Sequence, residues 1–156
     1  LFLTGQSSLT LEEIGTSIAF IALSCFSFAA LTAFLTTFIT SNSGFSALAT
    51  VVGTVVGFLA GAYVPMGVLP DSVASVISAL PFAFSAMLLR GPLTAGVLET
   101  LTAGSTQAAE ALREFYGITL TVGSYSPSTV VAVVAMIATA VFFLFASALF
   151  LRRRIS

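Results

Sequence analysis

Residues 128–151 read STVVAVVAMIATAVFFLFASALFL, and Arg152, Arg153 and Arg154 follow directly. The run contains no charged residue, and it exceeds the roughly 20 helical residues needed to cross a hydrocarbon core about 30 Å thick. A helix that is apolar on every side suits lipid rather than water. We therefore predict a transmembrane helix over 128–151. Because basic residues beside a span favour the inner side, we expect a cytoplasmic C-terminus.

Two further charge-free runs, 14–40 and 44–63, precede this span and are also predicted to cross the membrane. Thr10 and Glu13 have the spacing of a capping box, which predicts that the first helix begins just after Thr10. Only residues 41–43 separate the two runs, so we expect a tight helical hairpin with antiparallel spans. Span 128–151 has its own start signal, with Ser126 as the predicted N-cap and Pro127 in the first helical position.

The composition agrees with a membrane environment. The chain is 58% hydrophobic with a mean hydropathy of +1.12, and 7% of its residues are charged. Soluble domains carry about 25% charged residues, so this chain could not cover a water-facing surface. We predict an all-α integral membrane protein that crosses the cell membrane several times, with the lipid bilayer as its first partner.

The residue types exclude several kinds of chemistry. The chain has no His, a single Cys and no Lys, so imidazole catalysis, a cysteine-based zinc site and a P-loop are all excluded within it. The net charge of −1 does not favour a nucleic-acid partner. We expect no catalytic, cofactor-binding or metal-binding residue here and therefore no enzymatic activity of its own.

The segment between the last two spans is neither a span nor an ordinary loop. Prolines at 65, 70, 81 and 92 interrupt an apolar stretch over 65–92, so each half is too short to span, and we predict a broken, re-entrant helical pair. Residues 93–127 are more polar and are predicted to form an external loop with a surface helix over 105–115. The antiparallel spans place this segment on the outer side. The chain begins with Leu1, and we treat 1–156 as one transmembrane domain fragment.

Small and hydroxyl residues mark the faces of the first two spans. Gly53, Gly57 and Gly61 lie four residues apart on one helix face, where another helix can approach closely. Packing inside one subunit and a dimer interface are both open interpretations. Ser and Thr residues along 14–40 either form a polar wall beside a substrate path or bond to carbonyls one turn earlier, and the second interpretation is favoured.

Residues 57–93 read GFLAGAYVPMGVLPDSVASVISALPFAFSAMLLRGPL. This stretch resembles the signature region of ATP-binding-cassette (ABC) type-2 permeases, in particular those of bacterial multidrug and antibiotic exporters. The matching positions are Gly57, Phe58, Gly61, Tyr63, Pro65, Gly67, Leu69, Pro70, Pro81 and Arg90, with Gly53 one turn before them. The resemblance covers the whole chain as the C-terminal half of such a subunit.

The resemblance implies the permease subunit of an exporter that moves a drug-like or other amphipathic substrate out of the cell. It implies a second permease subunit, identical or different, and an ABC ATPase subunit or domain that binds ATP and Mg²⁺. The re-entrant pair would help to close the outer side of the pathway. The first three spans and the coupling helix of the family are absent from these residues, so the fragment alone is not expected to transport.

Two other functional classes remain as alternatives. A non-transporting membrane anchor or assembly protein would need no ATPase partner. Half of a secondary transporter would also contain broken helices, although proton-coupled carriers usually place ionisable groups within their spans, and the three predicted spans have none.

Overall fold

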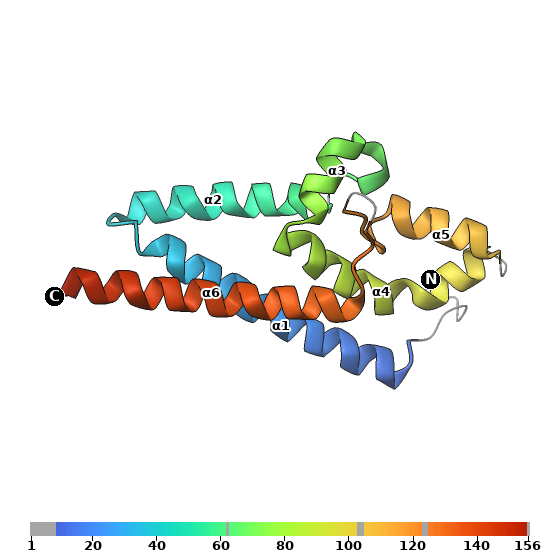
Figure 1. The fold of residues 1–156 in the computed structure, drawn as a ribbon, viewed down its shortest axis with the longest axis horizontal. Helices are drawn as coiled ribbons and strands as arrows, with labels where there is room; N and C mark the ends of the chain where they lie inside the picture. The colour runs from blue at the N-terminus through green and yellow to red at the C-terminus, as the bar shows by residue number, and fades with distance from the viewer. Residues whose placement is uncertain (1–8, 62, 103–104, 123–124, 156) are drawn as a thin grey trace.

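The chain is an all-α membrane protein, as the sequence predicted. The computed structural model describes residues 9–61, 63–102, 105–122 and 125–155. The helices, in chain order (Figure 1), are α1 (Leu11–Thr36), α2 (Asn42–Leu59), the short 3-10 helix η2 (Met66–Val68), α3 (Asp71–Ser78), α4 (Pro81–Thr102), α5 (Thr106–Phe115) and α6 (Thr129–Ile155). By length and composition, α1, α2, α4 and α6 could each cross a membrane.

α1 and α6 form the centre of the fold, side by side and antiparallel (Figure 1). α4 packs against both of them over the part of the bundle where α1 begins and α6 begins. α2 runs alongside but buries none of its residues, and its main contact is with α4. The bundle is therefore compact around α1, α4 and α6, and α2 lies at its margin.

The helix ends agree in part with the predicted ones. Glu13 receives a hydrogen bond from the Thr10 backbone and donates its own backbone N–H to the Thr10 hydroxyl, so the capping box is confirmed. The hairpin after α1 is also confirmed, with the Ser41 hydroxyl accepting the Gly44 N–H at 3.1 Å. The predicted start of the last span is wrong by two residues. Ser128 caps α6, because its hydroxyl and its carbonyl accept the N–H groups of the first turn.

The predicted break before Pro81 is present, with α3 before it and α4 after it, but the prediction that both halves are too short to span is wrong for α4. α3 has 8 residues, whereas α4 has 22 and continues through Gly91 and Pro92 to Thr102. A proline removes one backbone hydrogen bond and bends a helix without having to end it, and membrane helices tolerate it well. The Thr94 hydroxyl donates to the Arg90 carbonyl at 2.6 Å one turn from the proline, and α4 is bent in Figure 1.

The core holds the broken pair against the long helices. Its buried members include Ala83 and Leu88 of α4, Met136 of α6 and Leu120 of the segment after α5. Two hydroxyl contacts reinforce the packing inside the bundle. Ser27 of α1 donates to a carbonyl of α6 at 3.0 Å, and Ser85 of α4 bonds to Ser24 of α1 at 2.8 Å. Buried polar bonds of this kind join membrane helices, because an unpaired hydroxyl is costly in lipid.

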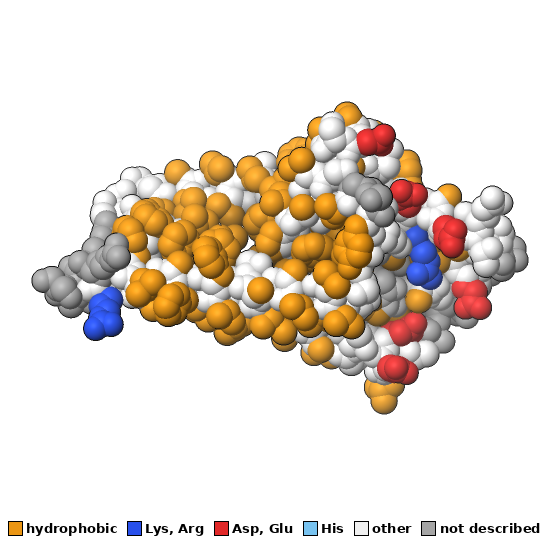
Figure 2. All heavy atoms as spheres, viewed as in Figure 1, with side chains coloured by type: hydrophobic (Ala, Val, Ile, Leu, Met, Phe, Trp, Pro, Cys, Tyr) orange, Lys and Arg blue, Asp and Glu red, His pale blue; other side chains and the backbone are white. Residues whose placement is uncertain are grey.

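Charges gather at the two ends of the bundle. Figure 2 shows the acidic side chains toward the end that carries α5, and a basic side chain at the far end, where α6 ends beside Arg152. We call the first of these the acidic end. Its acids come from the first turn of α1, the start of α3, the last turns of α4 and from α5: Glu12, Glu13, Asp71, Glu99, Glu110 and Glu114.

Candidate functional site at the acidic end

One arginine, in the middle of α4, joins the ends of α2 and α5. The Arg90 guanidinium, on α4, donates to the Ala60 carbonyl at 3.0 Å and the Gly61 carbonyl at 2.7 Å, both at the end of α2. It also donates to the Tyr116 carbonyl at 2.7 Å, at the end of α5. These carbonyls lie in the last turns of their helices, where no intrahelical donor is left for them. We call Arg90 and the segments 60–67 and 115–117 around it the Arg90 junction.

Two glycines make the tight geometry of this junction possible. Gly61 and Gly117 have φ of 66° and 65°, a left-handed conformation that ordinary residues adopt only with strain. A side chain on Gly117 would come within 2.8 Å of Met66 Cγ and 3.2 Å of an Arg90 nitrogen. One on Gly61 would come within 3.4 Å of the same guanidinium. Both helices therefore end in a glycine that lets the arginine reach their carbonyls.

Two further glycines pack against aromatic rings. A Cβ on Gly57 would collide with the Tyr63 ring, and that ring also packs against Phe58 with centroids 5.0 Å apart. A Cβ on Gly67 would collide with Phe115, whose Cα would lie 3.0 Å away. Tyr63 thus packs the segment after α2 against α2, and Phe115 packs α5 against η2.

The prolines and leucine of the motif shape the path from α2 to α4. Pro65 precedes η2, and its carbonyl accepts the Val68 N–H at 3.1 Å. Leu69 ends η2 and packs against the core. The Pro70 carbonyl accepts the first N–H groups of α3, and Pro81 is the first residue of α4, a position that proline favours.

Gly53 differs from the other glycines of the motif, because it contacts no neighbouring segment. Nothing lies within 4 Å of the place where its Cβ would be. The glycine repeat of α2 therefore divides in two. Gly57 and Gly61 serve contacts inside the chain, as the subunit-packing interpretation predicted, whereas Gly53 remains on an uncovered face.

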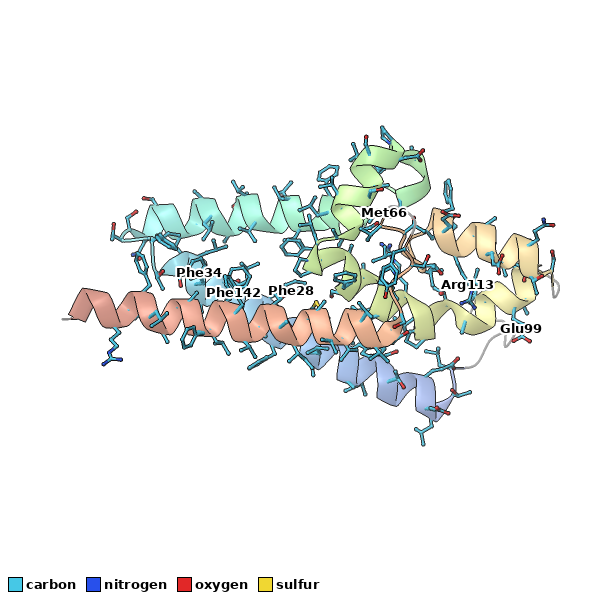
Figure 3. The ribbon with its side chains drawn as sticks, viewed as in Figure 1. Phe28, Phe34, Met66, Glu99, Arg113 and Phe142 are labelled. Carbon is cyan, nitrogen blue, oxygen red and sulfur yellow. The ribbon has the colours of Figure 1, made fainter. Side chains whose placement is uncertain are left out.

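Several residues of the junction were not identified from the sequence. Tyr116 contributes through its backbone carbonyl, which any residue could supply, so its side-chain type carried no signal. Met66 and Phe115 act as packing partners of glycines. Figure 3 shows Met66 between α3 and α5. Gly117 follows α5 almost directly, and a glycine just after a helix is the usual sign of a left-handed cap.

The hydroxyls of α1 behave mainly as the favoured interpretation predicted. Ser17, Ser27, Thr36 and Thr37 each donate to a carbonyl three or four residues earlier. The bonds from Ser24 to α4 and from Ser27 to α6 are additional contacts between helices that spacing alone did not identify. α1 therefore uses its hydroxyls for packing.

The acidic end is also hollowed. A half-open groove of about 690 Å³ lies between α3 and α5, and a second cavity of about 490 Å³ lies between α4, α5 and the start of α1. Arg113 and Glu99 line the second cavity, and Figure 3 shows both where α4 and α5 meet. Within the described ranges, no group of three metal-ligating side chains occurs.

Comparisons with protein-family models, with curated proteins and with solved structures found no match to this chain. Any functional assignment therefore depends on the residues and the geometry described above.

Proposed function

We propose that this chain belongs to the permease unit of an ATP-driven exporter that moves amphipathic or hydrophobic molecules out of the cell. The observation that supports this most is the convergence of the Gly57–Arg90 motif. Several of the residues that resemble ABC type-2 permeases meet in one junction, where Arg90 in the middle of α4 bonds to the ends of α2 and α5. A pathway closed by a broken helical pair needs such a fixed support, because short helices have little packing of their own.

The distribution of charge supports a cytoplasmic C-terminus in the cell membrane. The arginines that follow the apolar run of α6 lie at the opposite end from the acids, which is the arrangement that the positive-inside rule favours. Tyr63, Tyr116 and Tyr125 are all exposed and lie in the connections at the acidic end, and tyrosines concentrate at the membrane–water boundary. In this orientation α3, α4 and the Arg90 junction lie near the outer surface, with the pair dipping into the membrane.

This orientation predicts the result of a reporter experiment. A reporter that is active only in the cytoplasm, fused after Ser156, should be active, and the same reporter inserted after Ser105 should be inactive. Ser105 is exposed, between α4 and α5. Activity at Ser105 together with inactivity at the C-terminus would reverse the proposed topology.

The uncovered face of α2 supports a second permease subunit as partner. α2 buries no residue although it is apolar enough to span the membrane, and Gly53 leaves room for the close approach of another helix. We expect Gly53→Leu to weaken the pairing of subunits measured by cross-linking in membranes. Gly15→Leu is the matched control, since Gly15 is also unobstructed but lies on α1. Equal pairing in both variants would contradict this interface.

The decisive experiment concerns the ATPase, because the chain cannot hold ATP in a P-loop. The protein that contains this chain should co-purify with an ABC ATPase, and amphipathic compounds should stimulate ATP hydrolysis by the reconstituted complex. A monomeric protein that binds no ATPase would instead indicate the anchor or assembly role. Transport that persists without ATP would indicate a secondary transporter.

A further inference from the structure

We propose that the groove between α3 and α5 binds amphipathic organic ammonium ions at the acidic end of the bundle. Its binding chemistry is argued from the groove alone. Only the further statement that such an ion is a transported substrate depends on the proposed function.

The charge of the groove is negative. Asp71 and Glu114 both line it from opposite helices, and no basic residue is among its described lining residues. The two arginines of this end are directed elsewhere: Arg90 donates to backbone carbonyls, and Arg113 lines the neighbouring cavities. No hydrogen bond or ion pair joins either carboxylate to another side chain that the structure describes. A bound cation could therefore interact with two carboxylates without competition from a basic side chain among the described residues of the groove.

Glu114 also occupies an unusual place on its helix. It lies in the last turn of α5, which ends at Phe115. The C-terminal end of a helix carries a partial negative charge, so an acidic residue there is unfavourable unless a cation lies nearby. Asp71 has a structural role as well, since an acid in the first turn of α3 stabilises that helix. The position of Glu114 has no such structural benefit, which points to a ligand.

A buried hydroxyl gives an independent indication of a ligand. Ser78 lines the groove and is only 3% exposed, and its hydroxyl has no hydrogen-bond partner in the described part of the chain. Buried polar groups are almost always paired, so an unpaired one calls for an explanation. Ser72 and Ser75 lie on the same side of α3 and line the groove as well. Ammonium N–H groups would supply donors to these hydroxyls and to the carboxylates.

The remaining walls fit the apolar part of such a molecule. Met66, Leu69 and Phe115 line the groove, and the volume of about 690 Å³ is in the range of small-molecule sites. The groove thus combines polar groups and apolar walls. An amine with an aromatic or alkyl body matches it better than an inorganic cation, which would leave the apolar walls uncovered, or an anion, which the carboxylates would repel.

Binding can be measured with dansylcadaverine, a fluorescent alkylammonium ion, and with the protein in phosphatidylcholine nanodiscs, after subtraction of empty nanodiscs. We expect 6-(dansylamino)hexanoate, its carboxylate counterpart, to bind at least tenfold more weakly. The double variant Asp71→Asn/Glu114→Gln should weaken dansylcadaverine binding about tenfold or more, which corresponds to about 1.4 kcal/mol. Ser78→Ala should weaken it about tenfold, as expected for one hydrogen bond to a charged group.

Glu12→Gln is the matched control, because it removes a carboxylate from the same end but outside the groove. It should change the affinity less than twofold. If Glu12→Gln weakens binding as much as the double variant, or if the carboxylate probe binds equally well, the groove is not the site. These measurements need no ATPase. Loss of the proposed export function would leave them unchanged, whereas their failure would overturn the groove and leave the export proposal standing.

Discussion

Replacing Arg90 by Met removes the donors of the Arg90 junction while keeping most of the side-chain volume. Three carbonyls, those of Ala60, Gly61 and Tyr116, lose a charged partner at 2.7–3.0 Å. Hydrogen bonds to charged groups contribute about 1.5–3 kcal/mol each. The lower figure applies here because the side chain is half-buried, and three bonds then give about 4 kcal/mol. Water can reach some of these carbonyls in the variant, so we expect a loss of about 2–4 kcal/mol in the free energy of unfolding.

The assay is unfolding in mixed micelles by added sodium dodecyl sulfate, followed by far-ultraviolet circular dichroism. Arg113→Met is the matched control, since Arg113 is exposed and belongs to the same end of the molecule; it should cost less than about 0.5 kcal/mol. Arg90→Lys should be intermediate, because a single ammonium group cannot reproduce the planar fork of a guanidinium. Equal stability of Arg90→Met and Arg113→Met would refute the role given to the junction.

Two further substitutions are measured in the same assay. Gly117→Ala should lower the free energy of unfolding by about 1–3 kcal/mol, because it places an alanine in a left-handed conformation and in contact with Met66. Its control is Gly15→Ala, in open space inside α1, which should be neutral or stabilising by up to about 1 kcal/mol. Ser27→Ala should cost about 1 kcal/mol, because it breaks the buried bond to an α6 carbonyl. Its control is Thr36→Ala, which removes an exposed bond within α1 and should cost almost nothing. If a control variant is less stable than the variant it is paired with, the explanation for that pair is wrong.

The long helices were predictable because lipid imposes a simple rule on them. A charge-free run of about 20 residues has few alternatives to a membrane helix, so α1, α2 and α6 follow from composition and order alone. Caps close to a clear change of polarity, such as that formed by Thr10 and Glu13, were predictable for the same reason. The start of α6 was less so, because several polar residues precede the apolar run and Ser128 competes with Ser126.

The length of α4 could not be predicted from its own amino-acid sequence. Gly91 and Pro92 together are a strong local signal for the end of a helix. The helix nevertheless continues, because its first half is held in the core by α1 and α6 and its second half by α5. These contacts are non-local, and no pattern within residues 81–102 records them.

The candidate site was predictable as a set of residues but not as a structure. The resemblance named Gly57, Gly61, Gly67 and Arg90 together. The contacts of Gly61, Gly67 and Arg90 depend on partners more than twenty residues away in sequence, such as the carbonyl of Tyr116 that Arg90 binds. The half-buried bonds of Arg90 to the ends of α2 and α5 likewise could not be predicted from the residues around it.

The bonds of Arg90 have a mechanical consequence. α2 is in contact with little else in the described chain, yet its last turn shares one guanidinium with the last turn of α5. If α2 tilts, either α4 and α5 must move with it or the hydrogen bonds of Arg90 must break. A force applied at the hairpin before α2 would reach the Arg90 junction through this linkage, over a distance of about 27 Å for an 18-residue helix.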